Sequence, residues 1–246
     1  MGRLVHHHDP RLVRPARLRL RARARAPAVP HAAPAGRGGA GDARPPAEAV
    51  TISACRDDLA ASCAEAWRLI AAGVEAVRAP FHTPTIATVD AEGRPRLRTV
   101  VLRGCAPQAR RIRFHTDIRS AKSGELARDP RIAVHFYDPG LKVQVQLAGT
   151  AEIAGADGAG QEAWDSARLG SRACYAVEPG PGSPIAAGGA YGMPKDAAGI
   201  LAGVVHFAAI TVTADRLEWL LLDDAGHRRA VFDWTGTGWD GRWLVP

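Results

Sequence analysis

The 246-residue sequence has few of the features that mark common enzyme and membrane classes. It contains no P-loop, no GxSxG or HExxH motif, and no GxGxxG pattern after a predicted strand, so the chemistry of those motifs is not expected. No apolar run approaches about 18 residues, so no membrane-spanning helix is expected. The four cysteines follow no CxxC or zinc-ligand spacing, which favours reduced thiols, a cytoplasmic location and no metal site.

The excess of positive charge is confined to the N-terminal segment. Residues 1–48 carry ten arginines and three acidic residues, which account for the whole formal net charge of +7, and residues 49–246 are neutral. The segment is rich in alanine, arginine, proline and glycine and lacks aromatic residues, which predicts a disordered tail. A targeting peptide would contain serine, and a nucleic-acid arm would carry aromatic residues for base stacking. We therefore favour an extension without function and expect no nucleic-acid partner.

Residues 49–246 are expected to form one domain. Apolar residues at three- and four-residue steps predict a helix over residues 57–78, with Asp57 or Ser53 as its cap. Short β-rich runs bounded by turn residues predict strands over residues 85–89, 97–103, 111–116, 131–137, 142–153, 204–213, 216–222 and 229–234. Many strands with few βαβ units predict a mainly β (α+β) fold, namely a closed antiparallel barrel with peripheral helices.

Other segments complete this prediction. Shorter helices are predicted over residues 120–129 and 159–169. Residues 178–199 are rich in glycine and proline and are predicted to form a long loop.

A polar cluster is predicted where the strand over residues 111–116 meets the next helix. Thr116 ends the strand, Ser120 is placed to cap the helix, and Lys122 lies in its first turn. The first turn of a helix exposes unpaired N–H groups and the positive end of its dipole, which suit a phosphate. Together with Arg98, these residues could form a phosphate cradle. A capped surface helix with ordinary salt bridges explains them equally well.

Several motifs, in their order and spacing, resemble the pyridoxamine 5′-phosphate oxidase family over residues 55–246. They are PTIATV at 84–89, RTVVLR at 98–103, FHTD at 114–117, SxK at 120–122, DPR at 129–131, LKVQV at 141–145 and GWxGxWLVP at 238–246. The resemblance implies a split antiparallel β-barrel with peripheral helices. It also implies a homodimer that binds flavin mononucleotide (FMN) at the subunit interface.

The resemblance assigns roles to individual residues. Arg98 and Lys122 would meet the FMN phosphate, and the hydroxyl groups of Thr116 and Ser120 would donate to it. The remaining implied FMN contacts are Thr99, Val100, Val101, Arg103, His115, Gln144 and, from the second subunit, Trp219. The implied substrate contacts are Arg168, Ser171 and Arg228. No residue is assigned as catalytic.

The sequence also departs from the family pattern. Ala121 replaces a phosphate-binding arginine, Val231 replaces an arginine near the flavin, and Arg103 stands in place of a lysine. His115 stands where tyrosine is frequent, and Ser183 where a glutamine would contact the cofactor. We therefore expect an FMN-dependent oxidoreductase that acts on a small molecule, with the pyridoxamine phosphate oxidase reaction as its named form. A non-catalytic flavin-binding module is the alternative, and nucleic-acid binding through the basic tail ranks below both. A deazaflavin could take the place of FMN.

Overall fold

A computed structural model describes residues 55–246. The predicted tail, residues 1–48, and the candidate cap Ser53 lie outside the described residues. In the described part of the chain, one antiparallel sheet contains β1 (Thr85–Val89), β2 (Pro95–Thr99), β3 (Leu102–Ala106), β4 (Arg111–Asp117), β5 (Arg131–Asp138), β6 (Val143–Ala154), β7 (Phe207–Leu221), β8 (Arg228–Trp234) and β9 (Trp239–Leu244). The predicted mainly β class is confirmed.

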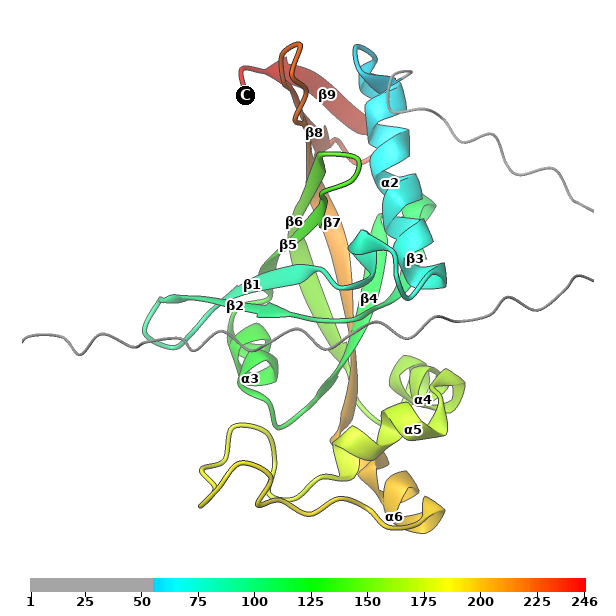
Figure 1. Ribbon diagram of the computed structural model, residues 1–246, viewed down its shortest axis with the longest axis vertical. Helices are drawn as coiled ribbons and strands as arrows, with labels where there is room; N and C mark the ends of the chain where they lie inside the picture. Colours follow the sequence, from blue (N-terminus) through cyan, green and yellow to red (C-terminus); the bar gives the residue numbers. More distant parts are fainter. Residues whose placement is uncertain (1–54) are drawn as a thin grey trace, which may run out of the picture. The chain divides into compact units, whose positions relative to one another are not determined.

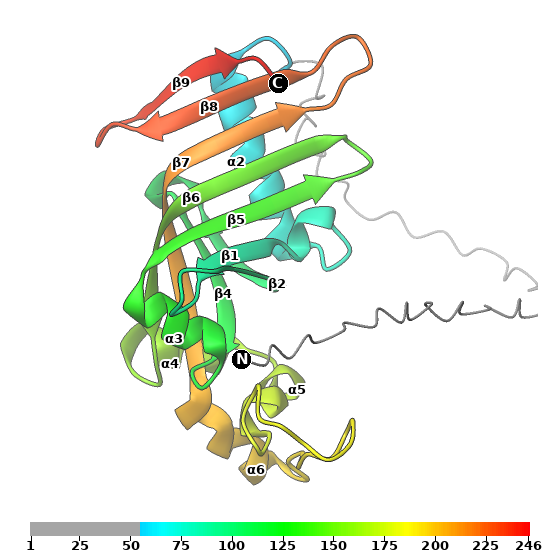
Figure 2. The same cartoon turned by 90° about the vertical axis from the view of Figure 1, so that its left-hand side faces the viewer.

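The strand order places β7 at the centre of the sheet. The order is β2-β1-β5-β6-β7-β4-β3, and β8 and β9 extend the sheet from β7 (Figure 2). β7 pairs with β4 as far as Thr213 and with β8 from Arg216 onward. Its register against β6 shifts between Ala148 and Gly149 at the same level. A β-carbon on Gly149 would lie 2.0 Å from the carbonyl oxygen of Thr213, so this close approach requires glycine.

The helices lie outside the sheet. They are α2 (Leu59–Glu75), α3 (Ala121–Arg128), α4 (Gly158–Ser166), α5 (Leu169–Arg172) and α6 (Ala197–Ala202), with short 3₁₀ turns η1 (Pro80–His82), η2 (Pro107–Ala109), η3 (Ala173–Ala176) and η4 (Gly203–His206). Figure 1 shows α2 along one side of the sheet and α4, α5 and α6 together at one end. The Asp58 carboxylate, and not Asp57, caps α2 by accepting from the Ala61 N–H at 2.9 Å. None of the described helices is long and apolar enough to cross a membrane.

The main core lies between α2 and the sheet. Val143, Val145 and Leu147 of β6 are buried, as their alternation predicts. Trp67 and Ile70 of α2 belong to the same buried cluster. A second, smaller cluster contains Ala163, Trp164, Phe207 and Ala209. The first half of β7 therefore contributes to both clusters.

Two predicted strand boundaries were wrong. Residues 97–103 form two strands, because the chain leaves the ladder after Thr99, where the Val100 N–H donates to the Pro84 carbonyl at 2.9 Å. Residues 204–213 and 216–222 contribute instead to the single strand β7, because the register shift accommodates one extra residue, Asp215.

Candidate functional site

Three polar side chains assemble where β4 passes into α3. The Thr116 and Ser120 hydroxyl oxygens lie 3.2 Å apart, and the Lys122 Nζ donates to them at 3.0 and 3.3 Å respectively. Both hydroxyl residues are buried. Ser120 occupies the N-cap position but makes no capping hydrogen bond, because its hydroxyl contacts Thr116, Lys122 and Ser123 instead. The predicted cap is thus correct in position and wrong in its hydrogen bond.

Arg98 lies beside this group, held by α3 and β1. Its guanidinium forms an ion pair with Glu125 at 2.6 Å and also donates to the Thr88 hydroxyl. Burial lowers the pKa of Lys122 and the nearby charge of Arg98 lowers it further, while the more weakly acting carboxylates of Asp117 and Glu125 oppose the shift. None of the ion pairs among residues 55–246 includes Lys122. We call Arg98, Thr116, Ser120 and Lys122 the α3 cluster. It presents two hydroxyls and a cation that makes no ion pair among residues 55–246, which suits an oxyanion.

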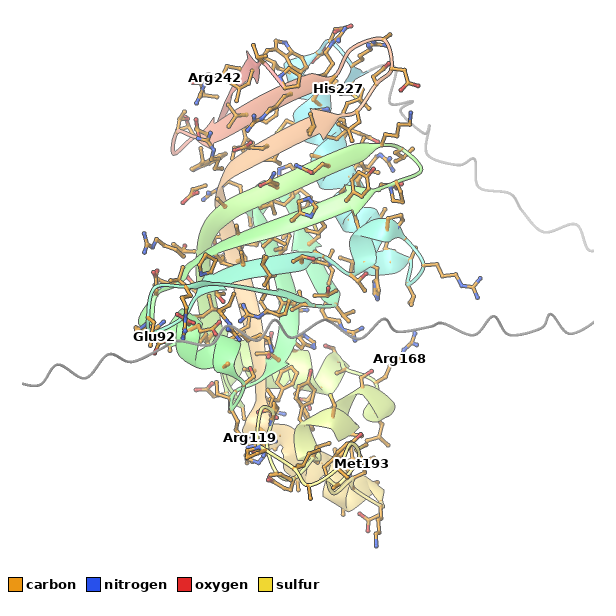
Figure 3. All side chains as sticks on the ribbon, turned by 60° about the vertical axis from the view of Figure 1, so that its left-hand side comes forward. Glu92, Arg119, Arg168, Met193, His227 and Arg242 are labelled. Carbon is orange, nitrogen blue, oxygen red and sulfur yellow. The ribbon has the colours of Figure 1, made fainter. Side chains whose placement is uncertain are left out.

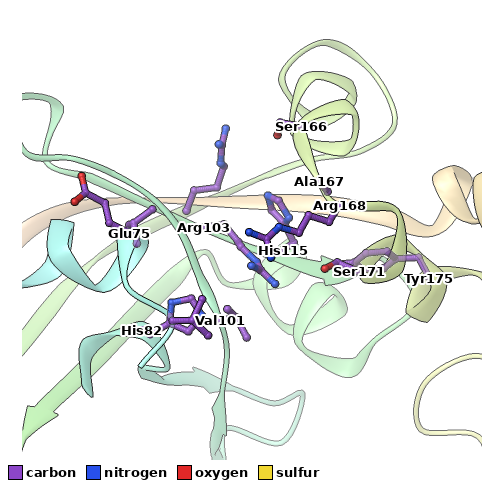
Figure 4. A pocket seen from close by; sticks show the side chains of 13 residues that line it. Glu75, His82, Val101, Arg103, His115, Ser166, Ala167, Arg168, Ser171 and Tyr175 are labelled. Carbon is purple, nitrogen blue, oxygen red and sulfur yellow. The ribbon is translucent and has the colours of Figure 1, made fainter. Parts of the chain in front are cut away.

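A cavity of about 430 Å³ opens on the other side of β4 (Figure 4). Its walls come from α2, η1, β3, β4, the end of α4, α5 and η3. Five of the predicted site residues line it: Val101, Arg103, His115, Arg168 and Ser171. The structure therefore brings three of the implied FMN contacts, Val101, Arg103 and His115, into one cavity with two of the three implied substrate contacts.

Positive charge dominates this cavity. Arg103, Arg113 and Arg168 line it, and none of them makes an ion pair within residues 55–246. Glu75 is the one carboxylate among the lining residues, and Figure 4 shows it across the cavity from Arg103 and Arg168. We call this space the arginine cavity.

His115 is an uncharged group in the wall of the arginine cavity. Burial lowers its pKa to about 4, and the charges of Arg113 and Arg103 contribute to the shift. Its Nε2 is buried without a hydrogen-bond partner among the described residues. The ring packs edge-on against Phe207, with centroids 4.8 Å apart. The imidazole is therefore neutral near pH 7 and leaves one polar atom for a ligand.

The remaining predicted contacts lie elsewhere. Thr99 is exposed at the end of β2, and Val100 is buried in the core. Trp219 is fully buried in the main core, and it shares a small cavity with Gln144 on the neighbouring strand. Arg228 forms an ion pair with Asp57 at 2.6 Å. Among the described residues, Trp219, Gln144 and Arg228 neither line the arginine cavity nor contact the α3 cluster. A ligand role for these three residues stays a prediction.

Sequence reasoning missed Arg119, which joins the two sites. Its guanidinium bonds to Asp117 and Glu178 at 2.8 and 2.6 Å, and to the Val177 and Tyr175 carbonyls at 3.1 and 3.4 Å. Figure 3 shows Arg119 at the helical end of the molecule, near the loop that holds Met193. Arg119 thus ties the turn before α3 to η3, whose Tyr175 lines the arginine cavity. Only the fold brings these segments together.

Residues 64–155 match the family model described as pyridoxamine 5′-phosphate oxidase, FMN-binding domain. Pyridoxine/pyridoxamine 5′-phosphate oxidase of Sphingopyxis alaskensis is 28% identical over 178 residues, covering 65% of this chain and 76% of the relative. The enzyme of the same name from Pseudomonas paraeruginosa is 43% identical over 68 residues, covering 28% of this chain and 31% of its own. The chain thus spans less than half of the second relative's length.

Two solved structures share the fold. A pyridoxamine 5′-phosphate oxidase-related, FMN-binding protein from Nostoc punctiforme superposes with a TM-score of 0.60 at 20% identity, covering 74% of this chain and 96% of that chain. PhzG from Burkholderia lata, in complex with tetrahydrophenazine-1-carboxylic acid, gives a TM-score of 0.60 at 17% identity, covering 78% and 96%. These likenesses confirm the predicted split barrel.

Proposed function

Because residues 64–155 match the family model described as pyridoxamine 5′-phosphate oxidase, FMN-binding domain, we propose that this chain is an FMN-dependent oxidoreductase. It transfers hydride or electrons between FMN and a small molecule, and it works as a cytoplasmic homodimer with FMN at the subunit interface. The observation that carries the proposal is the α3 cluster, where a lysine without a carboxylate partner meets two buried hydroxyls.

The donors of the α3 cluster match a phosphate monoester. Lys122 supplies a charge-assisted hydrogen bond, and the Thr116 and Ser120 hydroxyls supply two more donors. Arg98 adds a second positive charge, already oriented by Glu125. A bound anion would attract the protonated Lys122 and so offset the effects of burial and of Arg98, which lower the pKa of this residue. The chain's own residues therefore fit the phosphate end of FMN.

The arginine cavity is the place for the small molecule. His115 lines the cavity and is the sequence neighbour of Thr116, so the two sites share β4. FMN supplies the redox chemistry when it is bound, and the protein supplies orientation, polarity and exclusion of water. A neutral His115 can donate or accept one hydrogen bond with a substrate. The arginines attract a negatively charged substrate.

Lys122→Met tests the proposal directly. The variant loses the charge-assisted contact, so FMN affinity should fall about 100-fold, or ~2.7 kcal/mol. Quenching of FMN fluorescence during titration measures the dissociation constant. Lys142→Met is the matched control, because Lys142 is an exposed lysine whose ion-pair partner is Asp224, and it should bind FMN like the parent protein.

Equal FMN affinity in Lys122→Met and Lys142→Met would refute the phosphate assignment. A holoprotein whose flavin absorbance is bleached by no member of a panel of small-molecule substrates under anaerobic conditions would instead identify the chain as a non-catalytic flavin-binding module.

A further inference from the structure

Arg113 brings a charge to the arginine cavity that none of the predicted contacts accounts for. It lies on β4 two residues before His115, so both side chains stand on the same face of the strand. Both line the cavity, and both carry a buried ring or guanidinium nitrogen without a partner among residues 55–246. Unpaired buried polar atoms are costly, so they point to a ligand that completes their hydrogen bonds.

The position of Arg113 is set by a glycine on the neighbouring strand. Gly104 of β3 pairs with Arg113. A β-carbon at Gly104 would lie 3.3 Å from the Arg113 Cβ and 3.4 Å from its Nε. The guanidinium therefore lies across Gly104, in space that any other residue would share. The side chain is held in the cavity wall by packing, and its charge is left for a ligand.

Three guanidinium groups exceed what one anionic group needs. An arginine binds a carboxylate or phosphate through two parallel hydrogen bonds, and a single oxyanion group in this cavity would leave part of the positive charge unpaired. Arg103 approaches from β3, Arg168 from the turn before α5, and Arg113 from β4. The cations thus surround the cavity from different elements instead of forming one cradle.

We infer that Arg113 is a specificity-determining residue that selects substrates with two oxyanion groups, one held by Arg103 and Arg168 and the second by Arg113. The inference rests on the proposed function, because that function assigns the cavity to the substrate. The cavity volume of about 430 Å³ suits a small molecule of this kind. The uncharged His115 then donates or accepts one hydrogen bond with the same ligand.

Calorimetric titration of the FMN-saturated protein tests the inference with two pairs of probes. Inorganic pyrophosphate is compared with inorganic phosphate, and malonate with acetate, so that phosphate and carboxylate chemistry are distinguished. In one of the two pairs, the parent protein should bind the probe with two oxyanion groups at least about tenfold more tightly than the probe with one. In Arg113→Gln this preference should fall to about twofold or less, whereas affinity for the single-group probe should hardly change.

Two further variants sharpen the result. Arg111→Gln removes the same charge from an exposed position of the same strand, outside the cavity, and should keep the preference. Arg113→Lys keeps the charge without the two-pronged geometry and should give an intermediate preference. An unchanged preference in Arg113→Gln, an equal loss in Arg111→Gln, or a parent protein without any preference would each overturn the inference.

The flavin absorbance of the same samples reports separately on the proposed function. If FMN fails to bind while the apoprotein keeps an Arg113-dependent preference, the proposed function fails, and Arg113 selects a ligand with two oxyanion groups that is not the substrate of a flavin enzyme. If FMN binds and the preference is missing, the role of Arg113 fails alone.

Discussion

The α3 cluster and the arginine cavity lie on opposite sides of β4 and differ in how their charges are arranged. In the α3 cluster the polar groups already bond to one another, and Arg98 has a carboxylate partner. In the arginine cavity three guanidinium groups have none among the described residues. The first arrangement suits a ligand that stays bound, because its donors are held in place. The second suits a ligand that comes and goes and brings its own negative charge.

The sharpest test of this comparison removes both hydroxyls of the α3 cluster. Thr116→Val combined with Ser120→Ala deletes two donors and leaves Lys122 without its present partners. FMN affinity should fall about 100-fold, ~2.7 kcal/mol, measured by fluorescence titration. Pyrophosphate binding in the arginine cavity should stay within about twofold of the parent value. A parallel loss of both affinities would show that the two sites are one.

His115, in the wall of the arginine cavity, should make the unfolding free energy depend on pH. Its pKa falls from 6.5 in the unfolded chain to about 4 in the folded one, so the unfolded state gains a proton first as pH drops. The unfolding free energy should therefore decrease by about 2 kcal/mol between about pH 7 and about pH 4.5 on account of this residue.

Urea denaturation at both pH values measures this effect. The neutral variant His115→Gln should lose about that part of the pH dependence, whereas His135→Gln on the exposed side of β5 should keep it. If the unfolding free energy changes equally with pH in the parent protein and in His115→Gln, the imidazole has the same pKa in the folded and unfolded states.

Arg119 tests whether the two sites depend on each other. Arg119→Ala removes the contacts between the turn before α3 and η3, and it leaves the buried Asp117 without its guanidinium partner. The unfolding free energy should drop by about 1–3 kcal/mol. Amide exchange should accelerate around residues 173–178 and, to a lesser degree, in α3. Faster exchange confined to one of these segments would show that Arg119 serves only that segment.

Gly104→Ala should have the smallest effect. The new methyl group meets the Arg113 side chain at 3.3–3.4 Å and must displace it slightly. Pyrophosphate affinity should fall about two- to threefold, a change of less than ~1 kcal/mol, with the thermal midpoint nearly unchanged. The same substitution at Gly124, whose β-carbon would meet nothing within 4 Å, is the control for the added methyl group. FMN affinity should be equal in both variants.

The sequence was most informative where a structure is built from neighbouring residues. Thr116, Ser120 and Lys122 lie within seven positions at a strand-to-helix junction, so the pattern alone predicted their meeting. The alternation in β6 likewise predicted its buried face. Periodicity could not show that β7 is continuous, because Asp215 interrupts the alternation at the register shift.

Contacts between distant segments could not be predicted in the same way. Arg228 pairs with Asp57, which lies 171 positions earlier, and no pattern in the sequence indicates this pairing. Arg113 was missed because a lone arginine in a strand is usually a surface charge. Only the fold places Arg168 and Arg103 on the same cavity. The resemblance to a known family supplied some of these positions, and it did not supply Arg113.

The change of partner along β7 has a consequence for how the domain unfolds. One half of this strand pairs with β4 beside the proposed ligand sites, and the other half pairs with β8 at the far end of the sheet, while β6 runs along both. Neither half can detach without breaking the ladder that the other half shares. Denaturation should therefore proceed as a single cooperative transition, and fragments divided at Asp215 should not fold separately.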